Sequence, residues 1–124
     1  MIPKFRAWDE NGKIMNSVVS IDFETKEATN GGDIFKLENI ELMQSTGLKD
    51  KNSVEIFEGD IIKLQEGHTS YYVVEWHKKG MWVFRYIENK DQYYPFDLVY
   101  SFSDHIRNEV IGNRFENPEL LEVE

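Results

Sequence analysis

The chain has 124 residues, and its 14 lysines and arginines against 23 aspartates and glutamates give a formal net charge of −9. Hydrophobic residues make up 40% of the chain and aromatic residues 14%, which excludes a disordered acidic tail and indicates a globular core. The absence of cysteine excludes disulfides, thiolate nucleophiles and metal sites built from cysteine ligands.

Alternation of apolar and polar residues predicts strands in the first part of the chain. Residues 4–8 form a short strand candidate, and residues 15–23 have the period of one half-buried strand. The pair Asn11-Gly12 between them tolerates the positive φ of a hairpin turn, so we expect a first hairpin over residues 4–23. A further turn is expected at residues 30–33, and residues 34–43 do not decide between strand and irregular structure. The expected buried face of the longer strand consists of Met15, Val19, Ile21 and Phe23.

In the second part of the chain, turn residues recur at regular intervals between strand candidates. Residues 46–53 are a polar turn candidate, residues 54–57 are extended, and Glu58-Gly59-Asp60 forms a tight turn. Five strand candidates rich in β-branched and aromatic residues accompany them, at residues 61–64, 71–76, 81–87, 98–102 and 109–115. Five strands over about 55 residues have the spacing of small closed barrels.

These elements predict a mainly β fold with little helix. We expect an N-terminal β-hairpin region over residues 1–48, packed on an SH3-like small barrel over residues 49–124. Helical turns are expected only at residues 103–107 and at residues 117–121, where Asn and Pro occupy a cap and the first helical position.

Two pairs of side chains are candidates for metal or acid–base chemistry. Glu58 and Asp60 flank Gly59, but we favour a structural role in which Gly59 takes a positive φ and Asp60 binds turn backbone. Glu75 and His77 share a strand face, but a metal site needs a third ligand from elsewhere. We therefore expect no enzyme, metal or cofactor, with a metal-dependent hydrolase using these four residues as a minor alternative.

Eleven aromatic residues fall between Tyr71 and Phe102 and divide between two strand faces. One face fills the interior of a small barrel, while exposed Tyr and Trp among charges are typical of protein interfaces. We favour a role of these aromatic residues in the core and in an oligomer contact. A partner-binding groove is the second interpretation. Stacking on single-stranded bases is the third, because a basic groove is lacking. The candidate partner-binding residues are Tyr72, Trp76, Trp82, Tyr86, Tyr93 and Tyr94.

Three separated motifs occur in order along the chain: KFRAWD at residues 4–9, LMQSTGLKDKN through EGDII at residues 42–62, and VIGNRFENPELL at residues 110–121. Together they resemble the YopX family of phage and prophage proteins. The resemblance implies a phage or prophage origin in a bacterium and a β-rich fold with an SH3-like barrel part, and it implies no activity.

The motif residues are expected to be structural. Glycines stand where turns or close backbone approaches fall, and polar side chains stand where they satisfy turn and cap backbone groups. The glycines are Gly47, Gly59 and Gly112, and the polar residues are Glu58, Asp60, Asn113 and Asn117.

The sequence predicts a non-enzymatic, prophage-encoded binding or assembly protein that self-associates through β edges or its aromatic face. The alternative is an acidic decoy or inhibitor of a basic host protein, since residues 53–124 carry seven basic and fourteen acidic side chains. Nucleic acid is not an expected partner, because affinity for phosphates comes largely from Lys and Arg. No apolar run approaches the roughly 18 residues of a spanning helix, so we expect a soluble cytoplasmic protein.

Overall fold

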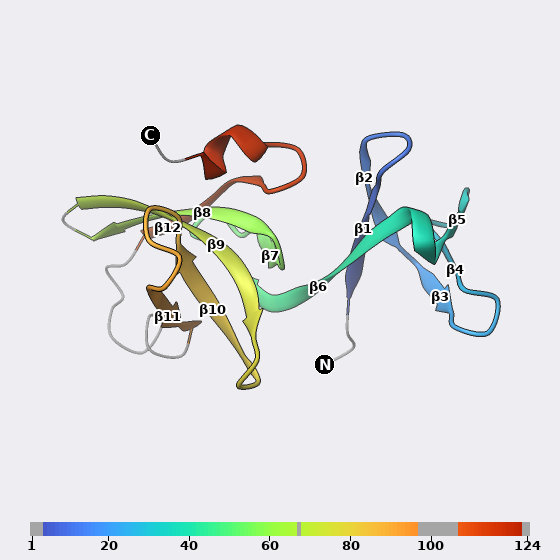
Figure 1. Ribbon diagram of the computed structural model, residues 1–124, viewed down its shortest axis with the longest axis horizontal. Helices are drawn as coiled ribbons and strands as arrows, with labels where there is room; N and C mark the ends of the chain where they lie inside the picture. The colour runs from blue at the N-terminus through green and yellow to red at the C-terminus, as the bar shows by residue number, and fades with distance from the viewer. Residues whose placement is uncertain (1–3, 67, 97–106, 123–124) are drawn as a thin grey trace. The chain divides into compact units, whose positions relative to one another are not determined.

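The computed structural model describes residues 4–66, 68–96 and 107–122 (Figure 1). The chain divides into two compact units, Met1–Ser45 and Thr46–Glu124. Strand β6 (Ile40–Lys49) begins in the first unit and ends in the second, and the predicted boundary between residues 48 and 49 falls within this strand.

The first unit consists of short antiparallel strands. Its elements are β1 (Phe5–Asp9), β2 (Ile14–Val18), β3 (Ser20–Asp22), β4 (Glu27–Thr29), β5 (Ile34–Lys36), the 3₁₀ turn η1 (Leu37–Asn39) and the first half of β6. β1 lies between β2 and β6, while β3, β4 and β5 form a separate three-stranded sheet. Ile21, Ala28 and Phe35 stand opposite one another in the register of this small sheet and share one of its faces. Ala28, at the centre of this row, packs with Ala7 and Ile40.

The single strand expected over residues 15–23 is wrong, because the chain bends at Val19. The backbone N–H of Val19 donates to the Thr29 carbonyl at 2.8 Å, so the chain leaves its pairing with β1 and pairs with β4 instead. The change of sheet breaks the alternation on which the prediction depended. Val19 and Phe23 are therefore 71% and 75% exposed, whereas Met15 and Ile21 are half-buried.

The first hairpin turn is present, but its positive φ lies at Lys13 (58°) and not at the Asn11-Gly12 pair. The Asp9 carboxylate accepts the Asn11 backbone N–H at 3.0 Å, and the Asp9 carbonyl accepts that of Lys13 at 2.8 Å. The aspartate therefore closes the turn one residue later than the sequence predicts.

The second unit is built on a curled five-stranded antiparallel sheet in the order β11-β10-β9-β8-β12 (Figure 1). Besides the second half of β6, its elements are β7 (Glu55–Phe57), β8 (Asp60–Glu66), β9 (His68–His77), β10 (Met81–Tyr86), β11 (Tyr93–Pro95), β12 (Arg107–Asn113) and the 3₁₀ turn η2 (Pro118–Leu121). The prediction of a mainly β fold with little helix is confirmed, and the finer SH3-like assignment stays a prediction.

The expected turn at residues 46–53 in the second unit begins later than predicted. Residues 46–49 belong to β6 and not to a turn, because Thr46 Oγ1 donates to the Ile56 carbonyl at 2.8 Å and secures β6 beside β7. The strand candidate at residues 98–102 lies outside the described residues, as do residues 103–106 of the expected helical turn.

The three motif glycines, Asp60 and Asn113 have the structural roles expected of them. Gly47 and Gly59 have positive φ (81° and 85°), and Asp60 Oδ2 accepts the Phe57 N–H at 2.8 Å. A Cβ at Gly112 would stand 2.4 Å from Asn117 Oδ1, which accepts the Asn113 N–H at 3.2 Å. Asn117 precedes η2 as predicted, but its side chain binds this upstream amide and does not cap η2.

A buried carboxylate joins the loop after β6 to strand β12. Asp50 is 7% exposed, and its Oδ1 accepts the N–H groups of Asn52 at 2.8 Å and Val54 at 2.9 Å. Its Oδ2 accepts the N–H of Val110 at 2.9 Å. Val110 adjoins the β-bulge in the pairing of β12 with β8, so one side chain satisfies backbone donors that the sheet leaves free.

We predict that Asp50→Ala lowers the free energy of unfolding by about 3 kcal/mol, because three backbone amides lose a charged, buried acceptor. Asp50→Asn retains one oxygen and should cost less. Urea denaturation followed by circular dichroism measures both. A loss below about 0.5 kcal/mol for Asp50→Ala, the size of an ordinary surface substitution, would contradict this role.

Gly112→Ala is predicted to cost about 1–3 kcal/mol, because its Cβ would overlap Asn117 Oδ1. Gly32→Ala is the matched control: the nearest atom to its Cβ is 3.6 Å away and its φ is not positive, so we expect a change within about 0.5 kcal/mol. Equal denaturation midpoints for the two variants would show that Gly112 is not needed for this close approach.

Candidate functional site

The register of the five-stranded sheet divides the six predicted binding residues between its two faces. Trp76 stands opposite Trp82, and Tyr72 opposite Tyr86, so these four share one face of β9 and β10. Tyr94 is opposite Phe84 and belongs to the same face. The sixth residue, Tyr93, is opposite Arg85 on the other face. The structure therefore brings five of the six residues together.

The middle of this aromatic face is core and not free surface. Phe84 is fully buried and stacks on Phe96, with ring centroids 4.0 Å apart and planes at 14°. Tyr72 meets Phe84 edge-on at 6.3 Å and is only 8% exposed. Tyr72 thus stabilises the sheet, and its side chain is covered by its neighbours.

One end of the face is a cluster of tyrosines. The rings of Tyr86 and Tyr94 lie 5.4 and 5.9 Å from the ring of Tyr72. Tyr86 donates its hydroxyl to Glu88 Oε2 at 2.8 Å, and Gln92 donates to the Tyr94 hydroxyl. The hydrogen bond to Glu88 raises the pKa of Tyr86, because it favours the protonated phenol. Burial raises the pKa of Tyr72.

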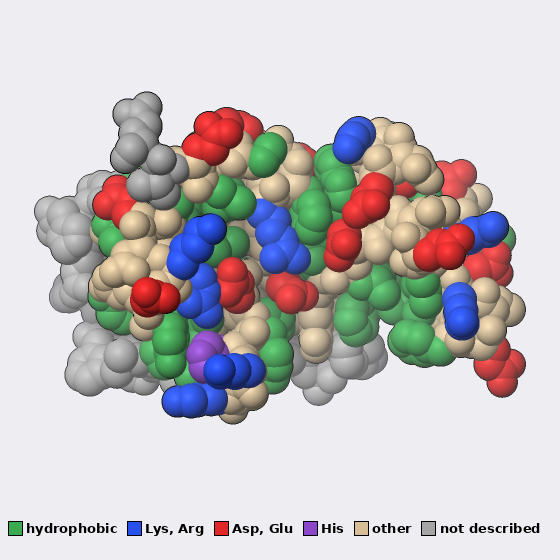
Figure 2. All heavy atoms as spheres, viewed as in Figure 1, with side chains coloured by type: hydrophobic (Ala, Val, Ile, Leu, Met, Phe, Trp, Pro, Cys, Tyr) green, Lys and Arg blue, Asp and Glu red, His purple; other side chains and the backbone are tan. Residues whose placement is uncertain are grey.

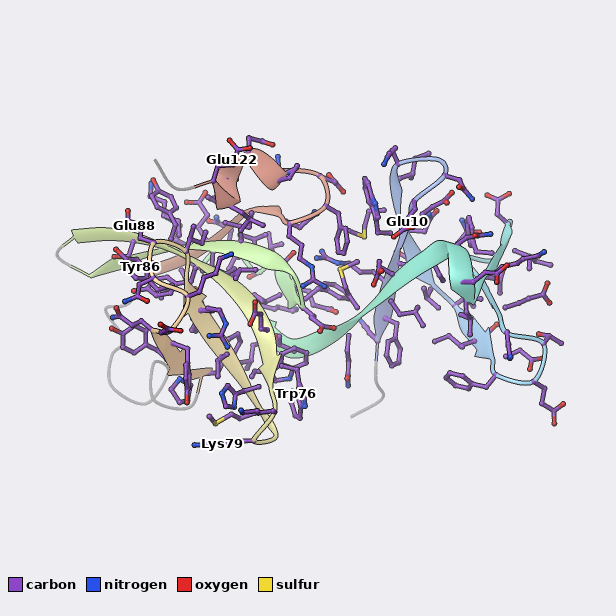
Figure 3. All side chains as sticks on the ribbon, in the orientation of Figure 1. Glu10, Trp76, Lys79, Tyr86, Glu88 and Glu122 are labelled. Atoms are coloured by element: carbon purple, nitrogen blue, oxygen red, sulfur yellow. The ribbon has the colours of Figure 1, made fainter. Side chains whose placement is uncertain are left out.

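The opposite end of the face is exposed. Trp76 packs edge-on against Trp82, with centroids 5.0 Å apart and planes at 77°, yet 53% of Trp76 remains exposed. Lys78 and Lys79 follow in the turn and are both exposed. We name Trp76, Lys78, Lys79 and Trp82 the tryptophan tip. Figure 2 shows basic side chains gathered beside a histidine at this end of the hairpin, and Figure 3 labels Trp76 and Lys79 there.

The turn that carries the tip is fixed by local bonds. His77 Nδ1 accepts the Lys79 N–H at 3.1 Å, and the His77 carbonyl accepts the Gly80 N–H at 2.8 Å. Gly80 takes the positive φ (87°) that such a three-residue hairpin loop requires. The two lysines therefore project from a defined turn beside an exposed indole.

The other face of the hairpin contains an ordered polar strip. Arg85 Nε donates to Glu75 Oε2 at 2.6 Å, and its guanidinium lies 5.5 Å from the centre of the Tyr93 ring. The imidazole of His77 packs on the same ring at 4.6 Å. Tyr93 is therefore a structural member of this strip, apart from the five residues of the aromatic face.

Three of the four residues of the hydrolase alternative make structural bonds. Asp60 is 1% exposed and accepts the Phe57 N–H, Glu75 pairs with Arg85, and His77 binds the turn after it. Glu58 is half-buried in the turn before β8. Within residues 4–66, 68–96 and 107–122, no three or more His, Asp or Glu side chains gather as a metal site would need.

The lysines of the tip are not among the residues predicted from the sequence, although the sequence carries a signal for them. Trp76 and Trp82 are six residues apart around a turn with a glycine at its end, which is the spacing that places two residues opposite each other in a hairpin. The five residues between two tryptophans paired at that spacing, 77–81 in this chain, lie in the turn or directly beside it.

Comparison with known proteins gives a family and a structural neighbour. A family model described as YopX protein matches residues 4–122. Protein EF1440 from Enterococcus faecalis, known from a crystal structure, is 30% identical and matches with a TM-score of 0.65 over 98% of this chain and 99% of its own. No curated protein matches. No helix among the described residues has the length and apolarity to cross a membrane.

The tyrosine cluster predicts a dependence of stability on alkaline pH. Because the folded pKa of Tyr86 is raised, its contribution is complete below the unfolded value of about 10 and is lost as the pH rises through the folded value. Glu88→Gln should lower the pKa of Tyr86, whereas Glu38→Gln should not. Phenolate absorbance during alkaline titration measures this, and identical curves for the two variants would contradict it.

Proposed function

The chain belongs to the YopX family, and from this premise we propose that it is a non-enzymatic binding module that self-associates through its tryptophan tip. The observation that carries the proposal is the 53% exposure of Trp76 beside Trp82. A large exposed aromatic side chain costs solubility, and Trp is enriched among the residues that dominate protein interfaces.

The local structure of the tip supports an interface. Trp82 and the bonded turn hold Trp76 in place, so its burial against another surface would order few additional groups. The neighbouring lysines favour an acidic partner, and a second copy of a chain with net charge −9 is one. The structural bonds of Asp60, Glu75 and His77 support a role without catalysis.

The proposal includes a biological setting. The three motifs at residues 4–9, 42–62 and 110–121 resemble phage and prophage proteins, which supports a prophage origin. The corresponding location is the cytoplasm of the infected or lysogenic bacterial cell.

Light scattering of the full chain tests the proposal. We expect a mass above the monomer value of 14.7 kDa at micromolar concentration, and a return to that value for Trp76→Ala. Phe23→Ala is the matched control, because Phe23 is even more exposed (75%) but belongs to the first unit. It should leave the mass unchanged.

Two outcomes would contradict the proposal. A wild-type mass of 14.7 kDa at all concentrations would exclude self-association and leave the acidic decoy as the better candidate. Dissociation by Phe23→Ala but not by Trp76→Ala would show that the chain associates through another surface.

A further inference from the structure

The second unit has a pocket whose charge is opposite to that of the tryptophan tip. The pocket has a volume of about 660 Å³. Its apolar lining consists of Ile61, Tyr71, Ile87 and Leu120, of which Tyr71 and Leu120 are 43% and 38% exposed and the two isoleucines are buried. Its acidic residues are Glu88, Glu119 and Glu122, and we name the whole the glutamate pocket.

The three carboxylates come from two separate segments. Glu88 follows β10, while Glu119 lies in η2 and Glu122 directly after it. In the part of the chain that the structure describes, no lysine or arginine forms an ion pair with any of the three. Among the described residues these carboxylates thus have no cationic partner, although Glu88 accepts the Tyr86 hydroxyl. Such carboxylates beside apolar side chains favour a ligand that is both cationic and apolar.

The tryptophan tip has that composition. Lys78-Lys79 is the only pair of adjacent basic residues in the sequence, and it stands between two tryptophans. Neither lysine is ion-paired within the described residues. An exposed indole fits an apolar wall, and two ammonium groups fit three carboxylates.

The tip and the pocket lie at opposite ends of the second unit. Figure 3 places Trp76 and Lys79 at one end of the β9–β10 hairpin and Glu88 and Glu122 at the other. One copy therefore cannot fill its own pocket with its own tip. A contact between the two features joins different copies in the same head-to-tail sense each time, which produces an open chain or a ring.

We propose that the tryptophan tip of one copy docks into the glutamate pocket of the next; this inference rests on the proposed function and names the surface that receives the tip. Burial of Trp76 supplies affinity, since exposed ion pairs contribute little of it. The lysine–glutamate pairs fix the orientation and exclude other acidic surfaces that lack an apolar wall.

Charge exchange tests the proposal. Lys78→Glu/Lys79→Glu reverses the tip, and Glu119→Lys/Glu122→Lys reverses the pocket. We expect each variant alone to be monomeric by light scattering, with the dissociation constant raised at least about tenfold. An equal mixture of the two should associate again, and so should a variant that carries all four substitutions. Lys36→Glu/Lys49→Glu, with both lysines exposed, is the matched control and should associate like the wild type.

The outcomes distinguish this inference from the proposed function. If Trp76→Ala dissociates the wild type but the pocket variant keeps the wild-type mass, self-association stands and the glutamate pocket is excluded. A monomeric wild type overturns both. Quenching of tryptophan fluorescence by a single-stranded oligothymidine, abolished by Lys78→Glu/Lys79→Glu, would overturn the docking proposal by identifying nucleic acid as the occupant of the tip.

Discussion

The five-stranded sheet depends on the burial of Phe84 between Tyr72 and Phe96. Within the described residues, the inner face of this curled sheet is filled by side chains of the strands themselves together with Phe96. Phe84 contributes by stacking on Phe96 at 4.0 Å and meeting Tyr72 edge-on, arrangements that aromatic rings prefer. The same contacts attach the three-residue strand β11, whose own ladder is short.

The position of the exposed tryptophans follows from that constraint. Side chains alternate strictly along β9 and β10, so the face that carries Tyr72 and Phe84 also carries Trp76 and Trp82. Trp76 and Trp82 are the last aromatic pair before the turn of the hairpin, and among the described residues no third ring stacks on them. The exposed tryptophan pair that we assign to binding thus continues the row of aromatic side chains that stabilises the sheet.

Strict alternation also explains which parts of the structure the sequence could predict. It located the strands around residues 71–76 and 81–87, and it failed at Val19, where one backbone hydrogen bond moves the chain to another sheet. Residues 46–49 look like a turn because they are polar, yet Thr46 bonds across to Ile56. β11 escaped prediction because it has three residues and ends in proline. At the candidate site, the spacing in the sequence predicts which aromatic residues share a strand face. Which of these residues are covered depends on Phe96 and on the curl of the sheet.

The proposed assembly requires that the hairpin tip is free in the monomer and covered in the assembled protein. Hydrogen–deuterium exchange of the wild type at increasing protein concentration measures this directly, without any substitution. We predict that the amides of residues 76–82 and 119–122 gain protection together as the mass rises. A rise in mass with unchanged exchange in both segments would contradict it.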